Sequence, residues 1–438
     1  MATTEEAAPF VQAFRLAQGI QGESALVTAR RDAAMQNFAA LGFPGRKQEA
    51  WRFTDLRPLT ATPILPDSAP GIDLDETFIA PARLSVSSFR IVLVKGCVAP
   101  KLSCMTGLPD GVWMGSTAEA AQTRPDLLET AFDASDNAGA QPLASLNAAF
   151  FADGFIVAIG AGIVLETPIE IIHVTRSDSA VSWHTRNAII LGAGSQATVV
   201  ESAIGSGPGW TNIVTSVDIG EGGKLRHAKV QNESIEAIHT ALIRATVARS
   251  GRYEIFNLTL GARLSRQDMH IALAGESASF ALNGAYLLRG TQEATIAPFV
   301  DHQAFGCKTN EVVKGVMDDR AHGVFLGMMA VRPGADQTNA HQLNRNLLLS
   351  REARVDTKPE LEIFADDVKC SHGATVGSLD EAALFYLRSR GLDEETARHM
   401  LVEAFAAEVI DTADLGDAIS SYLRRQLQAW LDGPKNGI

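Results

Sequence analysis

The spacing of hydrophobic and polar residues divides this chain into three regions, of which the first, residues 1–150, is mostly helical in pattern. Helix-forming residues run from Ala29 to Leu41 and stop at Gly42, with Pro44 just beyond. A glycine after the last periodic position, followed by a proline, is a typical helix stop signal. The short apolar run Phe89–Val94 predicts one strand in the same region. We therefore expect an N-terminal, mostly helical domain.

Residues 151–376 change to short, β-branched apolar runs such as IEIIHV, NAIILG and YEIFNLTLG. Glycine-bearing turns punctuate these runs at Gly194, Gly222, Gly251 and Gly275, which are separated by 28, 29 and 24 residues. Evenly spaced strands and turns indicate a sandwich, a barrel or a solenoid. A period of roughly 20 to 30 residues without a helix in each repeat favours a β-helix. We predict a β-helix core for this region.

Residues 377–438 return to helical spacing. Ser378 and Glu381 fit a capping box for a first helix that ends at Gly391, and a second helix begins near Asp393. Such apolar stripes usually pack helices on one another, although an aromatic residue near the end of the chain can also dock a partner. The stripes of the second and third helices are Ala397, Met400, Leu401, Ala404 and Phe405, then Leu415, Ile419, Tyr422, Leu423, Leu427, Trp430 and Leu431.

Composition indicates a globular protein rather than a membrane, disordered or nucleic-acid-binding one. The chain has 438 residues, of which 46% are hydrophobic and 20% charged. Its net charge of −13 argues against nucleic acid or an anionic membrane as the main partner. No apolar run reaches the length of a membrane span. The beginning, MATTEEAAPF, lacks the basic segment of a signal peptide, so we expect a cytoplasmic protein.

Cysteine usage agrees with a reducing compartment. Four cysteines in a chain of this length do not make a disulfide scaffold, and no C-x-x-C pair occurs. Cys370 stands out because His372 follows two positions later in an apparently extended segment, where alternate side chains project to the same face. A thiol beside an imidazole suits zinc, copper or iron, but two ligands do not close a site. The pair is therefore either ordinary packing and hydrogen bonding or half of a site completed elsewhere.

Several other chemistries find no support in the sequence. The nearest match to a phosphate-binding loop, Gly222-Gly223-Lys224-Leu225, lacks the upstream glycine and the hydroxyl that holds Mg²⁺, so we expect no bound nucleotide. There is no G-x-S-x-G or H-E-x-x-H motif, and we interpret the histidines other than His372 as structural. The acidic pairs Asp318-Asp319 and Asp366-Asp367 keep a β-helix carbohydrate-active enzyme as a remote alternative. Adjacent strand residues point to opposite faces, which disfavours it.

Longer segments of the chain, from Gly45–Leu56 to Ala383–Gly391, resemble one known family, the SufB/SufD iron–sulfur cluster assembly proteins. The segment CSHGATVGSLD (Cys370–Asp380) helps to separate SufD from SufB within the family. It has Gly373 where SufB has glutamate, and this difference, together with the length of 438 residues, makes the chain most similar to SufD. The region His302–Lys314 departs from the family pattern at Phe305-Gly306 and Asn310-Glu311. The similar segments are Gly45–Leu56, Phe151–Val174, Val312–Asp319, Gly323–Ser350, Thr357–Gly377 and Ala383–Gly391.

The resemblance implies a right-handed parallel β-helix, residues 151–376, between an N-terminal domain (1–150) and a C-terminal helical domain (377–438). It implies a non-catalytic subunit that pairs with SufB along the C-terminal part of the β-helices and docks the ATPase SufC on the C-terminal helices. From these helices we expect Tyr386, Arg390, Phe405 and Trp430 to bind partners.

The resemblance also assigns a role to the cysteine–histidine pair. His372, with Cys370 alongside, would hold a transient iron–sulfur cluster at the subunit interface together with a SufB cysteine. The ATPase supplied by SufC agrees with the missing phosphate-binding loop in this chain. A SufB-like scaffold, or a homodimer of this chain, is the alternative within the same family.

Overall fold

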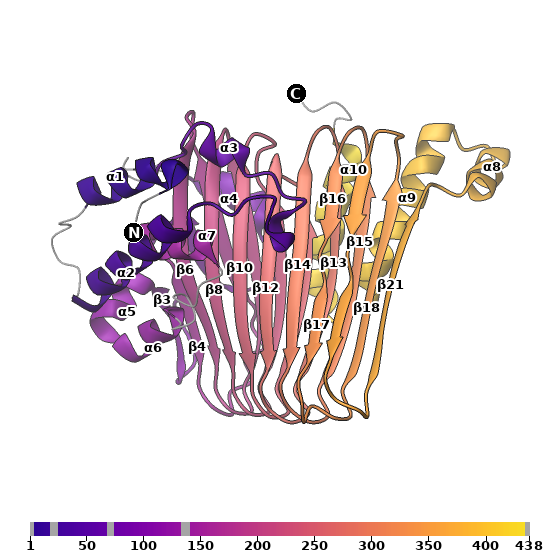
Figure 1. Ribbon diagram of the computed structural model, residues 1–438. Coiled ribbons are helices and arrows are strands. Elements are labelled where there is room, and N and C mark those ends of the chain that lie inside the picture. Colours follow the sequence, from indigo (N-terminus) through magenta and orange to yellow (C-terminus); the bar gives the residue numbers. More distant parts are fainter. Residues whose placement is uncertain (1–3, 18–24, 68–73, 133–140, 434–438) are drawn as a thin grey trace.

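Two long, mostly parallel β-sheets wound from one chain form the body of the protein (Figure 1). The structure, a computed structural model, describes residues 4–17, 25–67, 74–132 and 141–433. One sheet has ten strands and the other eleven, and between Phe155 and Phe325 successive strands alternate between them. Each turn of the chain thus adds one strand to each sheet, which is a parallel β-solenoid. The predicted fold class, a β-helix core with helical ends, is confirmed.

The sheet that contains Phe89–Val94 is called the first sheet, and the sheet that contains Val112–Ser116 is called the second sheet. Pairing is parallel throughout, except that β1 pairs with β2, and β3 with β4, in antiparallel fashion. The first sheet has the order β2 (Cys97–Val98), β1 (Phe89–Val94), β5 (Ile169–Arg176), β7 (Gln196–Ser206), β9 (Lys224–Asn232), β11 (Arg252–Thr259), β13 (Ser279–Leu288), β15 (Lys308–Met317), β18 (Asn339–Leu348) and β21 (Lys369–Gly377). The second sheet has the order β19 (Arg354–Thr357), β16 (His322–Phe325), β14 (Glu293–His302), β12 (Leu264–Leu273), β10 (Ile238–Val247), β8 (Gly209–Ile219), β6 (Val181–Leu191), β4 (Phe155–Ile159) and β3 (Val112–Ser116). In addition, β17 (Met328–Val331) pairs with β14, and β20 (Glu360–Ile363) pairs with β17.

The evenly spaced turns that the sequence predicts are stacked and hydrogen-bonded to one another. Gly194 N donates to Glu221 O at 2.7 Å, and Gly222 N donates to Arg249 O at 2.9 Å, one turn further on. Both glycines have positive φ, as a left-handed turn position favours. In the next turn this position is occupied by Ser250, beside the predicted Gly251. The Gly222-Gly223 segment is therefore a solenoid turn leading into β9, and no helix follows it as in a phosphate-binding loop.

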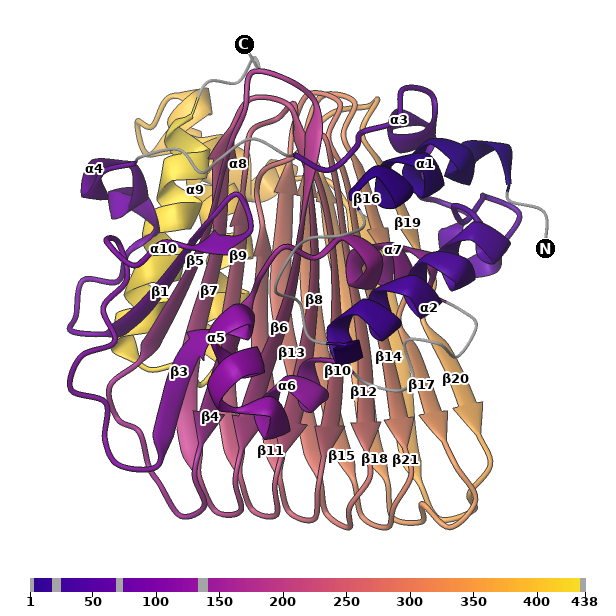
Figure 2. The same ribbon diagram turned by 90° about the vertical axis from the view of Figure 1, so that its left-hand side faces the viewer.

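Most of the N-terminal helices cover the outer face of the second sheet (Figure 2), but Ile79 and Ala82 pack on β1 and β5 of the first sheet. Phe10 and Phe43 pack against Trp210 of β8, and Phe38 packs against both phenylalanines. The predicted helix ends at Leu41 as expected, and the predicted strand is β1. Both β1 and β3 belong to the sheets although they precede residue 151. The helical elements here are η1 (Glu5–Ala7), α1 (Ala8–Ala17), α2 (Ala25–Leu41), η2 (Glu49–Trp51), α3 (Arg57–Thr60), α4 (Glu76–Ile79), η3 (Ala80–Ala82), α5 (Thr117–Thr123), α6 (Pro125–Ala131) and α7 (Pro142–Phe150).

Three C-terminal helices follow β21: α8 (Glu381–Ser389), α9 (Glu394–Thr412) and α10 (Asp417–Asp432). Helices α9 and α10 bury their apolar side chains against the outer face of the first sheet, on the side opposite α1, α2 and α7. The predicted capping box is wrong, because the carboxylate of Asp380 accepts from the N–H groups of Ala382 and Ala383. The predicted start of α9 is confirmed, since Asp393 caps it. Among the described residues, no helix combines the length and apolarity needed to cross a membrane.

Candidate functional site

Strand β21, which carries the predicted cysteine–histidine pair, is the last strand of the first sheet. It pairs with β18 on one side, and no described strand pairs with its other edge. Figure 1 shows β21 at the end of the solenoid, next to the C-terminal helices. An uncovered edge presents backbone N–H and C=O groups that another strand can pair with. The chain therefore leaves its last coil open at the place where its candidate chemistry lies.

Cys370 and His372 both continue interior columns of the solenoid. Cys370 is in register with Ala340, and His372 with Gln342; both of these β18 residues are buried. The two side chains thus share one face, as the sequence predicts. Cys370 is half-buried against the interior apolar core, and burial raises the pKa of its thiol. The side chain of His372 is exposed and makes no hydrogen bond or ion pair with any residue that the structure describes.

No group of three or more histidine, cysteine, aspartate or glutamate side chains is placed to hold a metal ion among the described residues. The pair on β21 is accordingly incomplete in this chain alone. An imidazole and a thiol on an open coil are suitable donors for iron, but a metal site built on them would need ligands beyond these two.

Beneath His372 lies a polar column that sequence reasoning missed. Glu311, Gln342 and His372 are in register on β15, β18 and β21. Gln342 Nε2 donates to Glu311 Oε2 at 2.7 Å, and both side chains are fully buried. Burial raises the pKa of Glu311 to about 8. The only sequence signal was Glu311 itself, an acidic residue within the segment that departs from the family pattern.

Apolar side chains surround the open end. Val376 of β21, Ile363 of β20 and Phe364 just after it are 51%, 42% and 59% exposed. Exposed large apolar residues that gather at one end of a protein mark a surface that another protein covers. Together with the free edge of β21, these three residues define a surface that we call the terminal-coil surface.

Of the predicted partner-binding residues, Tyr386 lies on α8, which projects away from the solenoid (Figure 1), and Arg390 is the C-cap of this helix. Tyr386 is 56% exposed, and the Arg390 guanidinium lies 5.1 Å from its ring centre. The neighbouring Phe385 is 75% exposed, whereas Leu384 is the one described α8 side chain that is buried. This helix thus presents an aromatic and basic face to solvent.

The other two predicted residues contact the chain's own solenoid. The ring of Phe405 on α9 makes a cation–π contact with Lys314 of β15, whose Nζ lies 4.5 Å from the ring centre. The Arg289 guanidinium lies 3.9 Å from the Trp430 ring centre and donates to Trp430 O at 2.7 Å. Both aromatic side chains are half-buried, so they hold α9 and α10 on the sheet. Whether their remaining surface binds a partner stays a prediction.

Several other histidines have structural contacts. His227 and His173 lie beside the buried Glu201 carboxylate, which also pairs with Lys229. His239 Nδ1 is 2.6 Å from Glu233 Oε2, again in the solenoid interior. These interior groups compensate one another's charge, as buried ionisable groups require.

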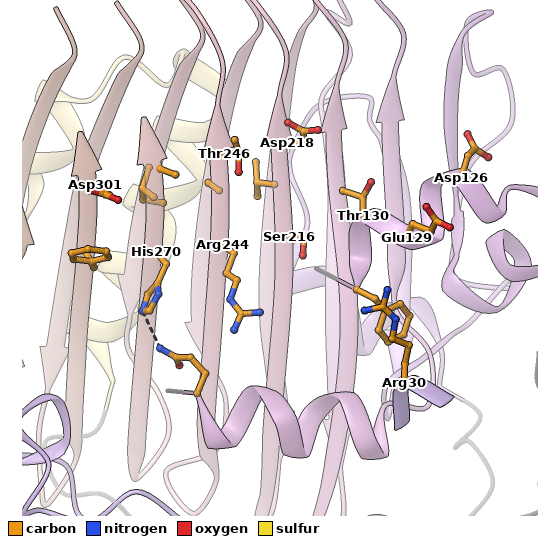
Figure 3. A pocket seen from close by; sticks show the side chains of 17 residues that line it. Arg30, Asp126, Glu129, Thr130, Ser216, Asp218, Arg244, Thr246, His270 and Asp301 are labelled. Atoms are coloured by element: carbon orange, nitrogen blue, oxygen red, sulfur yellow. Dashed lines mark hydrogen bonds between the residues drawn. The ribbon is translucent and has the colours of Figure 1, made fainter. Parts of the chain in front are cut away.

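A groove of about 840 Å³ lies on the outer face of the second sheet (Figure 3). Arg30, Arg244 and His270 line it, and Gln141 Nε2 lies 3.0 Å from His270 Nε2. Acidic side chains lie along the same groove, so its charge is mixed. They are Asp126, Glu129, Asp218 and Asp301. This groove lies on a different face from β21.

The fold and the candidate site together define a β-solenoid protein with helical ends whose chemistry-bearing side chains lie on an open coil. Residues 173–405 match the family model described as SUF system FeS cluster assembly, SufBD core domain, and residues 10–171 match the SufBD protein N-terminal region. The chain belongs to the SufBD family of iron–sulfur cluster assembly proteins, whose members are scaffold-type components. The predicted family is thereby confirmed.

Individual relatives agree. A SufBD family iron–sulfur cluster assembly protein of Synechocystis is 34% identical over 90% of this chain and 89% of its own length. The iron–sulfur cluster assembly protein SufD of Escherichia coli is 28% identical over 86% of this chain and 87% of its own. The chloroplastic protein ABCI7 of Arabidopsis thaliana is 29% identical over 87% and 81%.

Proposed function

We propose that this chain is the SufD-like subunit of a cytoplasmic assembly complex with SufB and the ATPase SufC. It pairs with SufB through the terminal-coil surface and docks SufC on its C-terminal helices. His372, with Cys370 beside it, contributes to a transient iron–sulfur site shared with SufB. Iron and sulfur are the substrates of this site, and the chain itself is non-catalytic.

The observation that carries this proposal is the position of His372 on the unpaired edge strand of the open coil. A partner strand that pairs with β21 would bring its own side chains beside the imidazole. A neutral imidazole binds iron through a ring nitrogen, and a thiolate from the partner would complete the pair. The incomplete ligand set of this chain is what a shared site requires.

The exposed face of α8 supports the docking of SufC. This helix follows β21 after only three residues, Ser378–Asp380, so a force on α8 acts directly on the strand that carries His372. ATP-driven movement of SufC would in this way open and close access to the shared site. The chemistry at His372 and the ATPase would be coupled through a short covalent connection.

The assembly is tested by co-expressing this chain with SufB and SufC from the same organism and measuring the mass of the purified complex. We expect a complex that contains all three proteins. A homodimer of this chain that excludes SufB would contradict the proposal and favour the ancestral, homodimeric alternative. Because the chain belongs to the SufBD family, the carbohydrate-active alternative loses its basis.

The role of His372 is tested in the purified complex with ferrous iron and a sulfur donor. We expect His372→Ala to slow cluster formation by at least about tenfold while the mass of the complex stays unchanged. The matched control is His341→Ala, because His341 is an exposed histidine on β18 whose Nδ1 lies 2.8 Å from Ser371 Oγ. Equal rates for the wild type and His372→Ala would refute the assignment. Cys370→Ser tests separately whether the thiol contributes.

A further inference from the structure

The amide of Gln342, which is in register with His372, has an unused hydrogen-bonding atom. Its nitrogen donates to Glu311, but its oxygen, Oε1, is buried without a hydrogen-bond partner among the described residues. Room for this amide is provided by Gly327, where an added Cβ would lie 2.1 Å from Gln342 Nε2. The backbone at Gly327 therefore leaves space for the Gln342 amide, which is held by the hydrogen bond from its nitrogen to Glu311.

The neighbouring interior amides of β18 differ in this respect. Asn344 Oδ1 accepts from Asn346 Nδ2 at 2.6 Å, and Asn346 Oδ1 accepts from Tyr286 Oη at 2.6 Å. Asn344 Nδ2 in turn donates to Val313 O at 3.1 Å. Gln342 is thus the one interior amide of this strand with an unpaired oxygen, and it is the one in register with His372.

We propose that Gln342, held in place by Glu311, is a positioning residue for His372, whose imidazole N–H donates to Gln342 Oε1. Adjacent in-register side chains on parallel strands are about 4.8 Å apart at the backbone, so the imidazole reaches the amide by a rotamer change. An unpaired buried acceptor is costly, and His372 is the exposed side chain in the same column with a donor to give.

This hydrogen bond determines which imidazole nitrogen is available for iron. When one imidazole nitrogen carries the proton and donates the hydrogen bond to Gln342 Oε1, the other nitrogen keeps its lone pair and faces the open coil. The value of that arrangement for iron binding rests on the proposed function, whereas the hydrogen bond itself is a property of the isolated chain. The two can therefore fail independently.

The test is ¹⁵N NMR of the full chain labelled at histidine, at a pH where the imidazole is neutral, with His372→Ala used to assign the signal. We expect the ratio of the two neutral tautomers of His372 to differ about fivefold from the ratio in the urea-unfolded chain. A difference of this size is what one hydrogen bond of ordinary net strength produces. Gln342→Met, which removes the acceptor at similar volume, should return the ratio to the unfolded value.

Asn344→Leu is the matched control, because it removes an interior amide of the same strand that is in register with Ala374 instead. It should leave the His372 ratio unchanged. The double variant Glu311→Gln/Gln342→Glu keeps an acceptor oxygen beneath His372 and should retain the wild-type preference. A wild-type ratio equal to that of the unfolded chain overturns the proposal even if Gln342→Met does not fold, and so does an unchanged ratio in a folded Gln342→Met variant.

Discussion

The ammonium group of Lys314 joins the solenoid to the C-terminal helices through Phe405. Lys314 Nζ donates to Phe405 O at 2.7 Å, lies over the Phe405 ring and pairs with the Glu408 carboxylate. The lysine side chain is only 2% exposed, so its charge depends on these partners. Because Lys314 lies on β15 three residues after Glu311, α9 is fastened to the same strand whose interior face supports the candidate site.

Replacing Lys314 by methionine should loosen α9 from the sheet. Hydrogen bonds from a charged donor contribute about 1.5–3 kcal/mol, so we expect the free energy of unfolding to fall by about 2 kcal/mol. Urea denaturation measures this fall, and hydrogen exchange should show faster exchange in α9. The control is Lys308→Met in the same strand, because Lys308 is exposed. Equal losses in both variants would show that the contact with Phe405 does not hold the helix.

Glu311 should make stability depend on pH in the neutral range. Its pKa in the folded chain, about 8, lies above the ordinary value of 4.5, so the folded state keeps a proton that the unfolded state releases. This contribution to stability is present below about pH 4.5 and is lost as pH rises toward 8. The free energy of unfolding of Glu311→Gln minus that of the wild type should therefore rise by about 1 kcal/mol per pH unit as the pH increases from about 5.5 to about 7.5.

The control for this experiment is Glu362→Gln, which changes an exposed carboxylate on β20. Its difference from the wild type should stay flat over the same pH range. A flat difference for Glu311→Gln as well would mean that the Glu311 carboxyl titrates as an ordinary exposed one does.

His184 should act in the opposite direction at acid pH. Burial beside Phe150 and Trp210 lowers the pKa of His184 to about 3. The unfolded chain binds a proton there below about pH 6.5, and the folded chain does not, so stability falls as pH falls. We expect His184→Gln to be less stable than the wild type at about pH 7.5 but to lose about 1 kcal/mol less per pH unit on acidification to about pH 5. His399→Gln on α9 should leave the wild-type slope unchanged.

The sequence predicted elements whose signals are local. The strand Phe89–Val94 and the start of α9 near Asp393 were both predicted correctly, because an apolar run and a helix start are signalled within a few residues. The stripe assigned to α9 was only partly right: Ala397 is buried, but Met400 is 46% exposed. Helix α9 packs against both the sheet and α10, so it buries side chains outside a single stripe. These include Val402, Ala406, Val409 and Ile410.

The candidate site shows where sequence reasoning stops. That Cys370 and His372 share a face follows from strand periodicity, and the structure places them so. The column beneath His372 depends on how Glu311, Gln342 and His372 are aligned on successive turns of the solenoid. Glu311 and Gln342 are 31 positions apart in the sequence, whereas Gln342 and His372 are 30 apart. No local pattern fixes that register. It follows from the stacking of whole turns, which only the folded solenoid defines.

The terminal-coil surface provides the sharpest test of pairing with SufB. Val376 and Ile363 are exposed at the open end, so Val376→Asp and Ile363→Asp should leave the chain folded, since changes at exposed positions usually cost under about 0.5 kcal/mol. In the complex, each would place a carboxylate in an apolar contact, which should abolish co-purification of SufB with this chain. The control is Leu16→Asp, because Leu16 is 81% exposed on α1, among the N-terminal helices. If SufB still co-purifies with both terminal-coil variants, it binds elsewhere, and His372 would then lie outside the subunit interface.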